Sequence, residues 1–310
     1  MNQALNTFAQ SLFSKHETRM YRKEKDVFLE HCKAEFTQLG YDEVVIKEEK
    51  NALGMTSRNL VAGPLDADVL ITAHYDTPGR NGFLLFFNPL FGGLLGSMLL
   101  MVLLVFLPRF LEGAIENGAQ WVNYAQIALG VVFIASFLLK NKHNHNDNTS
   151  GVIGVYQMAQ LIAQNPELKD RCAFVLFDHE EVLPGLLGSK AFAKWRRRNH
   201  PDKAGGVVIN LDCIGLGNVL TVMTKKKHQG WHDIAAFLEQ EGFSVKKVRG
   251  GMTGTSDHAP FSAGVSLLFQ KPSILGPLFI PNIHSGKDKT CDLDQLARLC
   301  DGVYAYLGRA

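Results

Sequence analysis

Acidic and imidazole side chains cluster directly after apolar, β-branched segments of the chain, where the strands of a sheet would end. The groups that follow such segments are His74 and Asp76, the pair Glu180 and Glu181, and Asp212. Because loops at the carboxyl ends of parallel strands converge on a ligand, we expect these side chains to meet at one edge of a sheet. Two further candidates are Asp147, in a polar turn before a helical pattern, and His284, in a loop before the last helical pattern.

Oxygen and nitrogen donors of this kind, with no cysteine among them, suit a hydrolytic site that holds two metal ions. The candidate ligands are His74, Asp147, Glu181, Asp212 and His284. The spacing His-x-Asp predicts in addition that Asp76 orients His74. Each group alone has an ordinary explanation, such as a helix N-cap at Asp147 or a solvated acidic turn at Glu180. Their recurrence after successive apolar segments favours the metal site.

Five segments, in order along the chain, resemble the motifs of the dizinc exopeptidases, which include aminopeptidase Y, bacterial leucyl aminopeptidases and glutamate carboxypeptidase. The segments are HYDTP at 74–78, NDNTSG at 146–151, FDHEEVLPGLLGSKAF at 177–192, NLDCIG at 210–215 and SDHAPF at 256–261, followed by His284. The resemblance implies a zinc-dependent exopeptidase with two Zn²⁺ ions per chain. It points first to an aminopeptidase that hydrolyses peptide substrates.

The resemblance also implies a role for each residue of the set. His74 and Asp212 would bind one zinc, Glu181 and His284 the other, and Asp147 would bridge them. Glu180 would be the general base, which takes a proton from the metal-bridging water and passes it to the leaving amine. Asp76 would orient His74 from behind.

The chain departs from the family pattern at three points. Residues 182–184 lengthen the turn after Glu181, and an apolar insertion separates the first histidine from the bridging aspartate. Relatives often place a tyrosine that stabilises an oxyanion in the segment corresponding to 245–255. The candidates to replace it here are Arg249, Thr253 and Thr255.

Short β-branched segments alternate with longer helical patterns, which predicts an α/β fold with a mainly parallel mixed sheet sandwiched by helices. The expected strands are 43–47, 69–74, 172–177, 206–212, 219–223 and 265–269, and the expected helices are 21–39, 151–163, 186–198, 231–241 and 293–307. We expect residues 1–80 and 143–310 to form one zinc-peptidase domain. An inserted helical hairpin at 81–142 would interrupt it.

The expected hairpin carries two segments without a charged side chain, 83–107 and 121–139. Each is close to the ~20 residues that a helix needs to cross a bilayer. Buried core helices would also be apolar, but residues 94–107 are apolar on every side and offer no polar face to water. We therefore expect a transmembrane hairpin that contacts lipid through both segments. The basic residues flanking it predict a catalytic domain on the cytoplasmic side of the membrane.

Composition excludes several other classes of protein. A formal net charge of +2 gives no reason to expect nucleic acid as a partner. The five cysteines form no CxxC pair, which indicates a reducing compartment, and the first residues lack the apolar core of a secretory signal. The alternatives that stay open are a carboxypeptidase, a glutaminyl cyclase-like enzyme and a non-catalytic scaffold of the same fold. The sequence indicates neither residue specificity nor oligomeric state.

Overall fold

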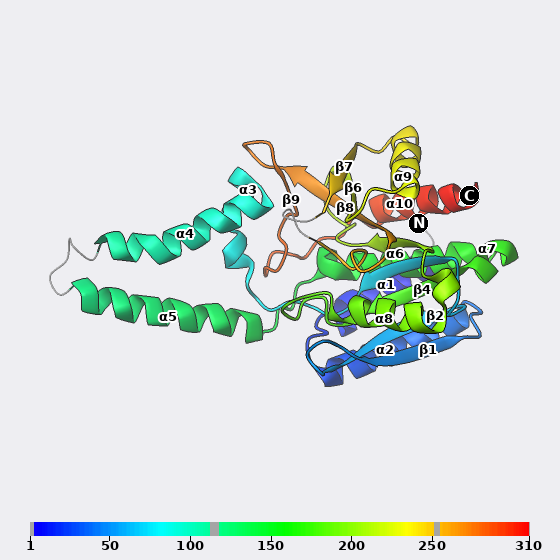
Figure 1. The fold of residues 1–310 in the computed structure, drawn as a ribbon, viewed down its shortest axis with the longest axis horizontal. Coiled ribbons are helices and arrows are strands. Elements are labelled where there is room, and N and C mark those ends of the chain that lie inside the picture. The colour runs from blue at the N-terminus through cyan, green and yellow to red at the C-terminus, as the bar shows by residue number, and fades with distance from the viewer. Residues whose placement is uncertain (1–2, 112–117, 251–254, 310) are drawn as a thin grey trace.

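The computed structural model describes residues 3–111, 118–250 and 255–309, and a mixed sheet forms the centre of this part of the chain (Figure 1). The strands lie in the order β1-β2-β4-β3-β5-β8-β6-β7, and β9 pairs with β8. Their bounds are β1 Val44–Lys50, β2 Thr56–Ala62, β3 Val69–His74, β4 Cys172–Phe177, β5 Val207–Leu211, β6 Val219–Thr224, β7 Val245–Arg249, β8 Ala263–Pro272 and β9 Leu278–Phe279. The central strands β4, β3, β5 and β8 run parallel to one another.

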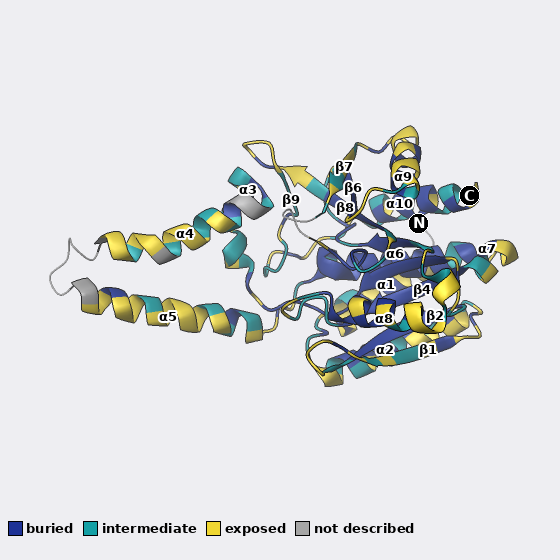
Figure 2. Cartoon of the chain, in the orientation of Figure 1, coloured by how far each residue is buried: buried dark blue, intermediate teal, exposed yellow. Residues whose placement is uncertain are grey.

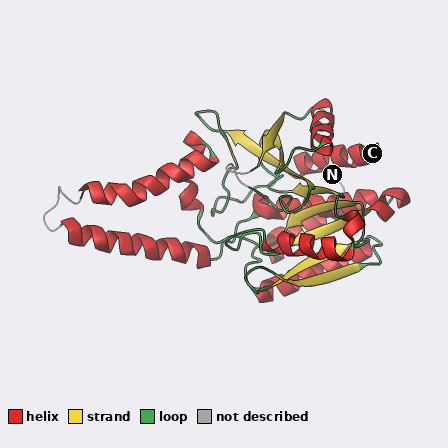
Figure 3. Ribbon diagram, in the orientation of Figure 1, coloured by secondary structure: helices red, strands yellow, loops and turns green. Residues whose placement is uncertain are grey.

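Helices cover both faces of this sheet, as Figure 3 shows. Their bounds are α1 Gln3–Lys15, α2 Arg22–Gln38, α6 Gly151–Ile162, α7 Pro166–Arg171, α8 Leu187–Asn199, α9 Gln229–Gln240 and α10 Leu293–Leu307. Helices α1, α2, α6, α9 and α10 contribute to the larger of two buried apolar clusters, and α8 contributes to the smaller one. The structure thus confirms the predicted α/β fold with a mainly parallel mixed sheet between helical layers.

Strand β4 shows how the sequence builds the two cores. Every residue of β4 is buried, and successive side chains of a strand point to opposite faces. Phe174 and Leu176 therefore enter the larger cluster beneath α6, whereas Val175 and Phe177 enter the smaller cluster with Phe192 of α8. A strand buried on both faces reads as a continuous apolar run, which is why its position could be predicted.

Strand β2 was not predicted, because half of its six buried residues are polar. The hydroxyl of Ser57 lies 3.0 Å from Nδ1 of His179, and Oδ1 of Asn59 accepts a hydrogen bond of 2.9 Å from the backbone N–H of Asp178. These polar groups hold the turn that follows β4, so their burial is compensated. The sequence patterns also missed α1, α7, the edge strand β7 and the short strand β9.

The insertion leaves the sheet as a pair of long helices, α4 (Gly93–Leu111) and α5 (Gly118–Leu138), which extend away from the rest of the molecule (Figure 1). The two ends of the insertion meet where Gly79 bridges Lys140 and the N–H of Arg80 donates to the carbonyl of Leu139 at 2.8 Å. All the described strands therefore lie at one end of the helix pair.

The first apolar segment is not one continuous helix. It begins as the 3₁₀ turn η1 (Gly82–Leu85) and the short helix α3 (Asn88–Phe91), and α4 starts only after Gly92, whose φ is +84°. This left-handed conformation suits glycine and ends α3. Helix α4 then continues through Pro108 to Leu111, so the stretch between the two apolar segments is partly helical. Residues 112–117 lie outside the described residues.

Many apolar residues of α4 and α5 are exposed, and the cartoon of these helices is largely yellow in Figure 2. Examples are Phe106 at 63% exposure, Val131 at 62% and Ile134 at 62%. Within the described residues, the segment Gln120–Leu138 is long and apolar enough to cross a membrane, whereas the apolar segment Gly96–Phe110 is shorter.

Candidate metal centre

The carboxyl ends of three adjacent parallel strands place most of the candidate site residues at one edge of the sheet. His74 is the last residue of β3, Asp212 directly follows β5, and the turn after β4 carries Glu180 and Glu181. Asp147 comes from the turn before α6, and His284 from the loop between β9 and α10. The structure therefore brings the predicted residues together, those that follow strands as well as Asp147 and His284.

Asp147 lies between the two histidines. Its Oδ1 is 3.4 Å from Nε2 of His74, and its Oδ2 is 3.0 Å from Nε2 of His284. Oδ1 of Asp212 lies 3.8 Å from the same nitrogen of His74, and Oε1 of Glu181 lies 3.3 Å from the same nitrogen of His284. One carboxylate thus faces two groups, each made of a histidine and a second carboxylate.

These residues fit metal ions, because their donor atoms are close together and a buried oxygen among them has no hydrogen-bond partner. Donor atoms of His74, Asp147 and Glu181 all lie within 4.8 Å of one another. Oδ2 of Asp147 is buried and accepts no hydrogen bond despite its short distance to His284. Imidazole and carboxylate are donors that Zn²⁺ accepts. A cation between the groups would satisfy the oxygen that the protein leaves without a partner.

The electrostatics of the site also favour a cation. Burial lowers the pKa values of His74 and His284, but the surrounding carboxylates outweigh burial and raise both pKa values above the usual range. Burial likewise opposes ionisation of Asp147, yet its two histidine neighbours hold its pKa below the usual range. Carboxylates outnumber imidazoles here, so the site attracts positive charge.

Glu180 stands beside this set in a partly enclosed position. Burial raises its pKa well above the usual value; the charge of His74 opposes this shift, whereas the neighbouring carboxylates of Glu181 and Asp257 add to it. A raised pKa is the property expected of a carboxyl group that exchanges protons near neutral pH.

Asp76 supports the site in two ways, only one of which was predicted. Its Oδ1 lies 3.6 Å from Nδ1 of His74, and its backbone carbonyl oxygen lies closer, 3.2 Å from the same nitrogen. In addition, Oδ1 and Oδ2 accept hydrogen bonds of 3.0 Å from the backbone N–H groups of Glu180 and Glu181, respectively. Asp76 therefore fixes the turn that presents both glutamates.

Three further residues support the site, and the sequence analysis assigned a role to none of them. Asp288 accepts hydrogen bonds from the backbone N–H groups of Asn146 and Asp147 at 2.9 and 3.0 Å. Asn81 lies with its Oδ1 2.9 Å from Nδ1 of His284, and Ser256 donates to Oδ2 of Asp212 at 2.6 Å. An acid four residues after the histidine was the available signal for Asp288; Asn81 offered none, because it lies inside the insertion.

The structure describes two of the three residues that were expected to stabilise an oxyanion. Arg249 ends β7 and Thr255 begins the described segment after it, and both are exposed. Thr253 lies outside the described residues. Which group stabilises an oxyanion therefore stays a prediction.

A parallel-centred sheet with two histidines and several carboxylates at its edge defines a metallohydrolase of the α/β class. Residues 140–306 match the family model described as Peptidase family M28. This match spans more than half of the 310 residues, and the chain belongs to this peptidase family. No curated protein matches the sequence.

Solved structures of zinc exopeptidase fold resemble the chain at low identity. The LapA aminopeptidase of Legionella pneumophila is 16% identical with a TM-score of 0.63, over 98% of this chain and 70% of that one. The glutaminyl cyclase of Porphyromonas gingivalis is 17% identical with a TM-score of 0.64, over 99% of this chain and 97% of the cyclase. BSAP, a zinc aminopeptidase from Bacillus subtilis, is 20% identical with a TM-score of 0.52, over 82% of this chain and 50% of BSAP. These likenesses concern the fold.

Proposed function

We propose that this M28 peptidase is a membrane-anchored, zinc-dependent aminopeptidase. The observation that carries the proposal is the position of Asp147, which offers one carboxylate oxygen to the side of His74 and the other to the side of His284. A carboxylate placed in this way is suited to bridge two cations. Membership of a peptidase family makes a peptide bond the natural substrate.

The proposed ligands fall into two groups around this carboxylate. His74 and Asp212 would hold one Zn²⁺, Glu181 and His284 would hold the other, and Asp147 would serve both. Zinc bound there supplies Lewis acidity, which makes a water molecule acidic near neutral pH and polarises the substrate carbonyl.

Glu180 is the proposed general base, and its carboxylate takes a proton from the attacking water and delivers it to the leaving amine. Its surroundings support this role, since burial raises its pKa toward the range in which a carboxyl group can both accept and donate. Asp76 is a positioning residue, because it holds the backbone of Glu180 and lies behind His74.

We propose further that residues 81–142 insert into a membrane as a helical hairpin, whereas residues 1–80 and 143–310 form the catalytic domain on the cytoplasmic side. Helices of 19 and 21 residues are about 28 and 31 Å long, which is close to the ~30 Å of a bilayer core. Water does not stabilise two helices whose apolar side chains are exposed in this way. Lipid along 83–107 and 121–139 would cover them.

A glutaminyl cyclase is the second candidate function. The cyclase from P. gingivalis and this chain cover each other almost completely, at 97% and 99%, whereas only 70% of LapA is covered. An enzyme of that kind would release ammonia from an N-terminal glutamine and leave the peptide otherwise intact.

The test is mass-spectrometric profiling of a peptide library with the detergent-purified full chain, zinc-loaded or treated with chelator. We expect stepwise loss of N-terminal residues, abolished by chelator and lowered about 10²–10⁴-fold in Glu180→Gln. Glu167→Gln, which changes an exposed glutamate of α7, should leave the rate unchanged. Zinc content should be the same in all three proteins.

Other outcomes would reject parts of the proposal. Loss of ammonia confined to peptides with N-terminal glutamine would replace the aminopeptidase with a cyclase. Release of C-terminal residues would make the enzyme a carboxypeptidase. A zinc-loaded protein without turnover on any peptide would indicate a scaffold, and an unchanged rate in Glu180→Gln would remove this residue from the mechanism.

A further inference from the structure

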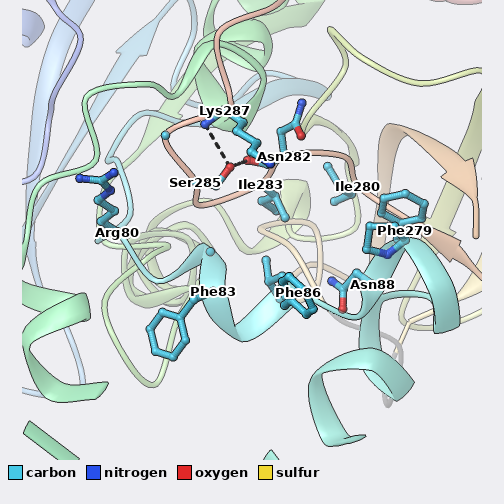
Figure 4. A pocket seen from close by; sticks show the side chains of 14 residues that line it. Arg80, Phe83, Phe86, Asn88, Phe279, Ile280, Asn282, Ile283, Ser285 and Lys287 are labelled. Atoms are coloured by element: carbon cyan, nitrogen blue, oxygen red, sulfur yellow. Dashed lines mark hydrogen bonds between the residues drawn. The ribbon is translucent and has the colours of Figure 1, made fainter. Parts of the chain in front are cut away.

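A cavity of about 750 Å³ lies at the base of the helix pair, between the start of the insertion and the loop that follows β9 (Figure 4). Phe83 and Phe86 line it from the insertion, and Phe279 and Ile280 line it from the loop. None of the seven residues proposed for the metal centre lines this cavity. Ile283 and Ser285, on either side of His284 in the chain, also line it, so the cavity adjoins the metal centre without including the proposed ligands. A ligand there need not be the substrate.

Two basic residues, Arg80 and Lys287, line the cavity, and Arg80 lies on the opposite side of it from Phe279 (Figure 4). The guanidinium of Arg80 lies beside Gly286, next to Lys287 in the chain. Both cations are exposed, and no ion pair joins either of them to an acidic group among the described residues. The cavity thus combines apolar lining residues with two basic ones that have no acidic partner among the described residues.

The surface next to the cavity is also apolar and exposed. Ile274 and Leu275, on the loop between β8 and β9, are 79% and 61% exposed. Their backbone N–H groups donate to the carbonyls of Pro89 and Leu90 in α3, at 3.0 and 3.1 Å, so this loop is attached to the base of the hairpin. Phe86, on the cavity wall, is 73% exposed. Apolar surface therefore continues from α4 and α5 onto the catalytic part of the chain.

We propose that this cavity binds an anionic phospholipid, with its phosphate between Arg80 and Lys287 and an acyl chain along Phe83, Phe86 and Phe279. The inference rests on the proposed insertion of the hairpin, which would bring the cavity to the level of the lipid headgroups. Arginine and lysine are the usual partners of phosphate, and basic residues at a membrane surface attract anionic lipid. The volume lies within the ~300–1,000 Å³ of small-molecule sites.

The experiment measures lipid binding to the full chain in detergent by native mass spectrometry, with phosphatidylglycerol and phosphatidylcholine of identical acyl chains. We expect phosphatidylglycerol to bind at least tenfold more tightly than phosphatidylcholine to the wild type. The double variant Arg80→Gln/Lys287→Gln should lose this preference. Ile280→Trp, which fills part of the cavity without changing charge, should weaken binding of phosphatidylglycerol about tenfold.

The matched control is Lys142→Gln/Lys289→Gln, which removes two exposed cations near the same base from positions that do not line the cavity. It should bind phosphatidylglycerol as the wild type does. Equal loss in both double variants would show that net charge alone attracts the lipid and would overturn the proposal. Unchanged binding in Arg80→Gln/Lys287→Gln or in Ile280→Trp would overturn it as well.

Two parallel measurements separate this inference from the proposed function. Zinc content and peptide turnover, measured on the same detergent samples, test the hydrolase independently of lipid. Specific binding of phosphatidylglycerol by a chain that alkaline carbonate strips from membranes would keep the lipid site and reject the anchor. If Arg80→Gln/Lys287→Gln raised KM for apolar peptides and left lipid binding unchanged, the cavity would belong to the substrate and the lipid assignment would be wrong.

Discussion

Asp257 is a fully buried carboxyl group near His74. Neither of its oxygens meets the geometry of a hydrogen bond with the described residues. Burial raises its pKa from the ordinary value of 3.8 to about 7, and the nearby charge of His74 and the hydroxyl of Ser189 oppose this only in part. In the metal-free protein, the folded state therefore keeps a proton on Asp257 that the unfolded chain would already have released.

This proton makes the stability of the metal-free protein depend on pH. Since the folded pKa is the higher one, the stabilisation is complete below about pH 4 and is lost as pH rises to about 7. An asparagine at position 257 does not titrate, so Asp257→Asn lacks this pH dependence. As pH rises from 5 to 8, its free energy of unfolding should therefore increase by roughly 2–3 kcal/mol relative to that of the wild type. Urea unfolding of chelator-treated proteins measures this difference. The exposed Asp42→Asn should show none, and a pH-independent difference for Asp257→Asn would contradict the assignment.

At the residue scale, the sequence indicates donor atoms better than their supports. His74 and Asp212 could be predicted because apolar strands point directly at them. The carboxylate of Asp288 and the amide of Asn81 could not, because each contacts a candidate ligand, through its backbone or its side chain, only after folding. Such contacts leave no spacing pattern along the chain.

The packing of α8 against β4 determines where the turn with Glu180 and Glu181 is placed. Gly188, in the first turn of α8, lies so close to the end of β4 that an added Cβ would come within 2.0 Å of the carbonyl oxygen of Asp178. Backbone atoms cannot give way as the end of a flexible side chain can, so this close approach requires glycine.

Gly188→Ala should therefore destabilise the protein by about 1–3 kcal/mol or more, the usual cost of overpacking. It should also lower zinc affinity, because the turn that carries Glu181 would shift. Gly205→Ala is the matched control, since a Cβ there meets no atom within 4 Å. Urea unfolding and zinc titration of both variants provide the measurement. If Gly188→Ala unfolded at the same urea concentration as the wild type, α8 could move away from Asp178 without loss of stability.

Elements with strong apolar patterns could be predicted from the sequence, including β3, β4 and β5. Strand β2 could not, because Ser57 and Asn59 are buried by their contacts to a distant turn rather than by hydrophobicity. The first apolar segment of the insertion was expected as one helix, but Gly92 and the contacts of α3 with the β8–β9 loop divide it. In β2 and in the first apolar segment alike, contacts between residues far apart in the sequence determine the local structure.

At the scale of the whole molecule, the insertion joins the catalytic part through two neighbouring points. Because the N–H of Arg80 bonds to Leu139, a short linker can replace the helices between them. We expect a chain in which Gly-Ser-Gly replaces residues 83–138 to move from the membrane to the soluble fraction and to keep its zinc.

Membrane fractionation with a carbonate wash measures this change. The matched control keeps the hairpin and changes Lys225, Lys226 and Lys227, all exposed, to glutamine. That variant should stay in the membrane, because apolar helices rather than a basic surface are the proposed anchor. Retention of the shortened chain after the wash, or release of the lysine variant, would refute the anchoring role of the hairpin.

The order of the strands has a consequence for how the protein is made. Strand β3 pairs with β4 and β5, and β2 pairs with β4, yet both β4 and β5 follow the hairpin in the chain. When the ribosome has produced only the first 80 residues, the inner edges of β2 and β3 therefore have no neighbours. The nascent hairpin emerges before the sheet can close, so the proposed anchor is complete before His74 can meet any other member of the metal centre. Delivery to the membrane would in this way precede the appearance of activity.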